Sequence, residues 1–210
     1  MPSDNKRILL VRHSLTDYDN PGPDGRFLGY SDPPINERGK KEAAYLHATL
    51  RELPFDQAYV GTSQRCRQTL DLILANRTIP ISVDPLLNEI HYGEWEGLTK
   101  KEIKDRYKSE WKKFEEDPSV DIPRFGELPR VCLTRALTWL SNVQCRYGLA
   151  VVDKTWLRLL LCSILFIPLA RYRDVIDAKI SSVTVLLNSE RGWRLETLNY
   201  GATSKRVFGI

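Results

Sequence analysis

The sequence predicts an α/β fold, a three-layer α/β/α sandwich with a mostly parallel central sheet and a small inserted helical cap. Short apolar segments of strand length alternate with longer segments of helical periodicity along most of the chain. The first apolar run, 8–11, is continuous, which is typical of a strand buried on both faces of a parallel sheet. A length of 210 residues fits a single domain, 1–210, with the cap inserted at about 99–129.

The first half of the chain contains three predicted strands and two predicted helices. Asn36 and Ser63 are typical N-cap residues, and a helical segment follows each of them. The segment 14–35 is rich in Pro and Gly and is therefore predicted to be a loop; ordered loops of this length are often functional. The elements are strands at 8–11, 57–60 and 81–83 and helices at about 37–53 and 64–76.

The second half begins with the predicted cap and ends with a predicted hairpin. A strongly charged helical segment, 99–117, is followed by a connection with several prolines, 118–129. A turn at 188–192 joins the last two strands. The remaining elements are helices at about 127–147 and from 157 to about 166, and strands at 149–152, 181–187 and 193–198.

Composition indicates an ordinary globular protein with a small anionic ligand. The net charge of +4 is not concentrated in a tail or on a helix face, so we do not expect nucleic acid as a partner. The most apolar stretch, 157–170, contains Pro168 and is too short to span a bilayer, so no membrane association is expected. The chain begins with a polar segment and its four cysteines form no metal-binding or disulfide pattern, which favours a cytoplasmic protein without a metal or other cofactor.

Arg12 and His13 directly follow the first predicted strand. The carboxyl ends of parallel strands form the edge of an α/β sheet at which ligands bind, so this pair indicates an anion site with a nucleophile or a general base. Arg65 falls in the first turn of the helix that follows the second strand, and is expected at the same edge. The segment 87–97, with its glycines, aromatic residues and three glutamates, is predicted to be a structured loop.

Four motifs occur in a fixed order and resemble those of the histidine phosphatase superfamily, the phosphoglycerate mutase-like group. The resemblance continues through Glu127 and Arg135 to the last strand, so it covers nearly the whole chain. The motifs are Arg12-His13-Ser14 with Thr16, Gly29 to Gly39, Ser63 to Thr69, and Leu87-Asn88-Glu89 with Gly93 to Gly97.

The resemblance implies a role for each of four residues. His13 matches the histidine that attacks phosphorus and becomes a phosphohistidine, and a neutral imidazole is a competent nucleophile. Arg12 and Arg65 match the two arginines that bind the phosphoryl oxygens, a task that suits planar guanidinium groups. Glu89 matches the acid that protonates the leaving oxygen and later helps to activate water. The resemblance implies no metal.

The chain departs from the family at the second catalytic histidine. That histidine is expected after the strand at 149–152 and binds the phosphoryl group opposite the nucleophile; no histidine follows His91, and we assign the position to Lys154. Lys154 can replace the histidine as an anion ligand, in which case a small phosphorylated metabolite is hydrolysed at a reduced rate. Alternatively the fold catalyses a non-phosphatase reaction on an anionic substrate such as a carboxylate. In the third alternative Lys154 pairs with Asp153, Trp156 narrows the pocket, and the protein is a non-catalytic binding pseudophosphatase. The oligomeric state is open, a dimer included.

Overall fold

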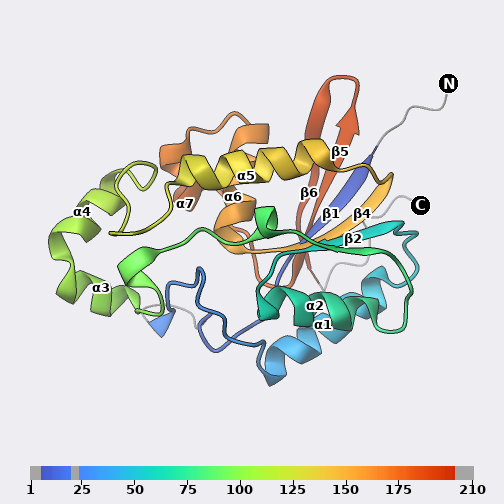
Figure 1. Cartoon of the computed structure of the whole chain (residues 1–210), viewed down its shortest axis with the longest axis horizontal. Helices are drawn as coiled ribbons and strands as arrows, with labels where there is room; N and C mark the ends of the chain where they lie inside the picture. The colour runs from blue at the N-terminus through green and yellow to red at the C-terminus, as the bar shows by residue number, and fades with distance from the viewer. Residues whose placement is uncertain (1–5, 20–23, 202–210) are drawn as a thin grey trace.

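The central feature of the fold is a mixed β-sheet between two layers of helices (Figure 1). The computed structural model describes residues 6–19 and 24–201, so part of the loop predicted at 14–35 lies outside the described residues. Within the described ranges the strands form one sheet of six in the order β3-β2-β4-β1-β5-β6. The first four in this order are parallel, whereas β5 is antiparallel to both β1 and β6. The strands are β1 (Arg7–Arg12), β2 (Gln57–Val60), β3 (Ile81–Val83), β4 (Tyr147–Val152), β5 (Ser182–Ser189) and β6 (Gly192–Gly201).

Side chains that alternate along β1 enter the cores on the two faces of the sheet. Ile8 and Leu10 pack into the core formed with α5 and α6, whereas Leu9 and Val11 pack into the core formed with α1 and α2. The strand is therefore buried on both faces, and the predicted α/β fold class with three layers is confirmed. The helices are α1 (Glu37–Leu50), α2 (Gln64–Leu74), α3 (Lys100–Arg106), α4 (Lys108–Glu116), α5 (Pro129–Asn142), α6 (Lys154–Ile164) and α7 (Tyr172–Val175).

The segment predicted to be a cap forms two short helices, α3 and α4, at one end of the molecule (Figure 1). Thr99 begins α3 with a capping box, as its sequence favours. Trp111 and Phe114 of α4 pack on Trp95, with ring centroids 5.7 and 5.0 Å apart. These rings are buried in the same apolar core as α5 and α6, so α3 and α4 are packed firmly against the rest of the fold.

Two parts of the second half differ from the sequence prediction. The helix expected at 127–147 is α5, which begins at Pro129 because proline fits the first helical position, and β4 starts five residues after α5 ends. The segment 167–180, for which no element was predicted, contains a 3₁₀ turn at Leu169–Arg171 and the short helix α7. Across the described ranges, no helix is long and apolar enough to cross a membrane.

Candidate active site

The register between β1 and β4 brings two polar residues together at the carboxyl edge of the sheet. The strands are parallel and Arg12 pairs with Val152, so the next residues, His13 and Asp153, leave the sheet side by side. The backbone N–H of His13 donates a 3.0 Å hydrogen bond to the carbonyl of Val152, which extends the ladder by one residue. Both side chains are almost completely buried.

Each nitrogen of the His13 imidazole lies close to an oxygen atom. Nδ1 lies 2.9 Å from the backbone carbonyl of Ser14, and because a carbonyl only accepts, Nδ1 must carry the proton. In the neutral ring the lone pair is therefore on Nε2, which lies 3.4 Å from Oδ1 of Asp153. Burial lowers the pKa of His13, which favours this neutral form. The lone pair that a nucleophilic histidine would use thus faces a carboxylate.

Arg65 is fully buried and every nitrogen of its guanidinium has a protein partner. Nε donates a 2.6 Å hydrogen bond to Oδ1 of Asp153. Nη1 and Nη2 each donate a 2.9 Å hydrogen bond to a backbone carbonyl, of Ser31 and of Gly29. The guanidinium is thereby fixed in one orientation, with a carboxylate where an external anion could otherwise bind.

Arg12 is also paired with a carboxylate. Its Nη2 donates a 2.7 Å hydrogen bond to Oδ1 of Asp19, and Nη1 donates one of 2.9 Å to the carbonyl of Ala178. The other oxygen of Asp19 accepts from the backbone and the hydroxyl of Thr16, which holds the carboxylate in place. Nε of Arg12 is buried without a hydrogen-bond partner among the described residues.

Glu89 bridges the loop after β3 to the start of α6. Its carboxylate accepts hydrogen bonds of 2.8 Å from the backbone N–H of Thr155 and 2.9 Å from those of Trp156 and Ile90. Free N–H groups at a helix N-terminus favour a bound anion. Burial and the nearby charge of Asp153 nevertheless raise the pKa of Glu89 to about 7. The carboxyl group can therefore exchange a proton near neutral pH.

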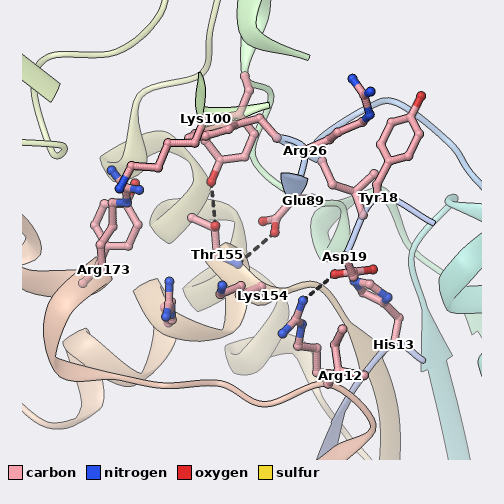
Figure 2. Close-up of a pocket in the computed structure, with 17 residues that line it drawn as sticks. Arg12, His13, Tyr18, Asp19, Arg26, Glu89, Lys100, Lys154, Thr155 and Arg173 are labelled. Carbon is pink, nitrogen blue, oxygen red and sulfur yellow. Dashed lines mark hydrogen bonds and ion pairs between the residues drawn. The ribbon is translucent and has the colours of Figure 1, made fainter. Parts of the chain in front are cut away.

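A cavity of about 380 Å³ opens above His13 and is strongly cationic (Figure 2). Lys154, the first residue of α6, has its side chain in this cavity. Burial and the nearby charges of Arg158 and Arg12 lower the pKa of Lys154 to about 8. Two acidic residues, Asp19 and Glu89, also line the cavity. The described basic residues of its wall are Arg12, Arg26, Lys100, Lys154, Arg158 and Arg173.

The structure brings four of the five predicted site residues around one cavity. Arg12, His13, Glu89 and Lys154 line it, whereas Arg65 lies outside the lining and contacts Asp153 instead. Asp153 is not among the site residues predicted from the sequence. The signal was present, since Asp153 directly follows a buried strand, as Arg12 and His13 do. Among the described residues, no group of three or more His, Cys, Asp or Glu side chains could hold a metal ion.

The chain is similar to known proteins over most of its length. The model of the histidine phosphatase superfamily (branch 1) matches residues 8–201. The chain is 28% identical over 204 residues to the adenosylcobalamin/alpha-ribazole phosphatase of Salmonella typhimurium, covering 90% of this chain and 100% of that protein. It is 26% identical over 170 residues to phosphoserine phosphatase 1 of Hydrogenobacter thermophilus, covering 79% of each.

A solved structure shares the fold over nearly the whole length. The alpha-ribazole phosphatase of Shigella flexneri superposes with a TM-score of 0.84 at 22% identity, covering 96% of this chain and 100% of that one. The family model extends from β1 to the end of β6 and so includes the whole sheet. The chain therefore belongs to branch 1 of the histidine phosphatase superfamily.

Proposed function

We propose that the protein binds a small phosphorylated metabolite in the cationic cavity and hydrolyses its phosphate monoester through His13, at a rate that Asp153 greatly reduces. The observation that carries this proposal is that His13 and Glu89, a nucleophile and an acid, line one cavity with six basic residues. Two curated relatives with similarity over most of the chain are phosphatases, which supports phosphate monoesters as the substrate class.

The proposed reaction has two steps. Nε2 of His13 attacks phosphorus, the bond between phosphorus and the leaving oxygen breaks, and that oxygen takes a proton from Glu89. Glu89 suits this role because its pKa is about 7, so it is partly protonated at neutral pH. Water, which gives a proton back to Glu89, then attacks the phosphohistidine and releases inorganic phosphate and free His13.

Asp153 opposes the first step. We infer that Asp153, rather than Lys154, stands at the position of the second histidine, because its carboxylate lies 3.4 Å from Nε2 of His13. A carboxylate there repels the incoming phosphoryl oxygens and binds the guanidinium of Arg65 that would otherwise hold them. Loss of one group that stabilises the transition state typically reduces the rate by about a hundredfold or more. Lys154 offsets part of this loss because its ammonium group lies in the same cavity.

A second candidate function, binding without catalysis, is supported by the contacts of Arg65. Each of its nitrogen atoms is already hydrogen-bonded within the protein, so the phosphoryl site is closed as it stands. In this alternative an anionic ligand occupies the cavity next to Lys154 and no bond is broken.

Hydrolysis of p-nitrophenyl phosphate by three variants tests the proposal. We expect slow turnover by the wild type, no turnover by His13→Ala, and about a hundredfold faster turnover by Asp153→His. His47→Ala is the matched control, because His47 lies on α1, where its Nδ1 contacts the carbonyl of Ile73 and not the cavity. Incubation with a ³²P-labelled phosphate monoester should label the wild type and not His13→Ala. Loss of this label in acid identifies a phosphohistidine, because phosphate esters of Ser and Thr are stable in acid.

The alternatives give different results in the same assay. Turnover that persists in His13→Ala contradicts the phosphohistidine mechanism. A wild type without turnover that still binds phosphate identifies a binding protein, and a gain in Asp153→His then shows that this one residue closed the site.

A further inference from the structure

Ion pairs compensate only part of the positive charge of the cavity. Next to His13, Arg12 forms an ion pair of 2.7 Å with Asp19, and Arg65 forms one of 2.6 Å with Asp153. Arg26 and Lys100 of the cavity wall also pair with acids, Glu102 at 3.4 Å and Glu115 at 3.9 Å. Lys154 has no carboxylate oxygen of the described residues within 4.0 Å, and the same holds for Arg158 of α6. The uncompensated charge of the cavity therefore includes these two residues.

Lys154 and Arg158 form a cationic pair on one face of α6. They are one helical turn apart, so their side chains lie on the same side of the helix, and both line the cavity. Nε of Arg158 is buried and has no hydrogen-bond partner among the described residues. Two like charges on partly buried side chains repel each other, and an anion between them would remove this repulsion. In Figure 2, Lys154 lies near the middle of the cavity, between Arg12 and Arg173 in this view.

Arg173 adds a third positive charge in a fixed position. Its guanidinium stacks on Phe114 of the cap, 4.4 Å from the ring centroid, and lies 5.6 Å from that of Trp111. These rings are buried and hold the guanidinium at the cavity wall. Two acids, Asp19 and Asp177, favour the charged form of Lys154 through their negative charge, but neither forms an ion pair with it.

We infer that Lys154 and Arg158, with Arg173 beside them, form a second anion-binding subsite that takes a phosphate or carboxylate group of the ligand. The subsite differs from the site at His13 in that its cations form no ion pair with the described residues, whereas Arg12 and Arg65 are paired with Asp19 and Asp153. The inference extends the proposed function and rests on it in one respect, that the ligand is an anion. It means that the ligand carries an anionic group remote from the reacting phosphate, or that it binds at the subsite alone.

Calorimetric titration with inorganic phosphate tests the subsite directly. The titration is made at pH 6.5 and low salt, where Lys154 is protonated in view of its pKa of about 8. The variants are Lys154→Met and Arg158→Met, which keep a flexible, unbranched side chain and remove its charge. Lys104→Met is the matched control, because Lys104 lies on α3 outside the cavity and its nearest acid is Glu115, 3.8 Å away. We expect phosphate to bind the wild type and the control alike, and each subsite variant about tenfold or more weakly.

Three further measurements accompany the phosphate titration. Titration with acetate shows whether the subsite has the higher affinity for phosphate or for carboxylate. A higher affinity for either of them supports the subsite. The thermal unfolding midpoints of all variants show whether they are folded. Titration of His13→Ala separates the subsite from the proposed reaction, because binding should persist there while turnover is lost. Equal binding by the wild type, Lys154→Met and Arg158→Met, or no binding by the wild type in the millimolar range, would overturn the inference.

Discussion

Asp153 and Arg65 form a buried ion pair at the carboxyl edge of the sheet, with 2.6 Å between Oδ1 and Nε. Two parallel strand ends and the first turn of a helix meet there, because Asp153 follows β4, His13 follows β1 and Arg65 lies in α2. The pair joins these elements through side chains that are nearly inaccessible to solvent. The contact therefore links the two sides of the candidate site and, in the proposed function, keeps the guanidinium of Arg65 from the phosphoryl group.

The charge of Asp153 should be important for stability. Asp153→Ala leaves the Arg65 guanidinium buried without its counter-ion, which typically costs about 3–5 kcal/mol in the free energy of unfolding. Asp153→Asn keeps a hydrogen-bond acceptor of the same size and should cost less. Urea denaturation followed by tryptophan fluorescence measures both values. A negligible cost of Asp153→Asn would show that the carboxylate charge does not stabilise Arg65, because this variant removes the charge and keeps an acceptor.

Glu89 should make stability depend on pH in the acid range. Burial and Asp153 raise its pKa to about 7 from 4.5, so the folded state keeps the proton at higher pH than the unfolded state. The stabilisation from this group is fully present below pH 4.5 and is lost as the pH rises through 7. We expect the free energy of unfolding of the wild type to fall by about 1–3 kcal/mol relative to Glu89→Gln across this window. Parallel curves for the two proteins would contradict the assigned pKa.

Lys154 should have the opposite dependence in the alkaline range. Its pKa is lowered to about 8 from 10.5, mainly by burial, so the folded state releases the proton before the unfolded state does. The charged ammonium is a cost below pH 8, and the free energy of unfolding should rise between pH 8 and 10.5. Lys154→Met should lack this rise and be the more stable protein at pH 7, whereas Lys104→Met should retain it. Urea denaturation in a pH series gives both curves.

Arg135 should act as a positioning residue for Glu89. It forms a bidentate pair with Glu127, at 2.8 and 2.7 Å, and donates to the backbone carbonyls of Leu86, Asn88 and Glu89. Lysine cannot reproduce this planar set of donors.

We therefore expect Arg135→Lys to lower the free energy of unfolding by about 1–3 kcal/mol. Faster amide exchange in the loop before Glu89 should accompany this change. Arg130→Lys, at an exposed position of α5, is the control. Unchanged exchange in Arg135→Lys would show that Glu89 is held in place by α6 alone.

Much of the architecture could be predicted because local patterns determine it. The continuous apolar run at 8–11 identified β1, and Asn36 indeed caps α1 by accepting a hydrogen bond from the backbone of Gly39. The antiparallel placement of β5 beside β1 could not be read from these segments, because strand order depends on contacts between distant parts of the chain. The same is true of α7, a four-residue helix that carries Arg173 into the cavity.

The site was predicted less completely than the fold. The sequence motifs identify Arg12, His13 and Glu89, which line the cavity. They do not show which side chain lies opposite the imidazole of His13. That depends on the register of β1 against β4, which puts Asp153 beside His13. The side chain that meets the imidazole is thus set by pairing between two strands far apart in the sequence.

Asp153 should also influence the binding of anions next to His13, as a competitor that is part of the chain. Its carboxylate is attached to the chain next to Arg65 and so competes with any external anion at a very high effective concentration that dilution cannot lower. A ligand must displace this tethered competitor before it can contact the guanidinium. Because the displaced carboxylate stays nearby and repels other anions, external anions should bind only weakly next to His13.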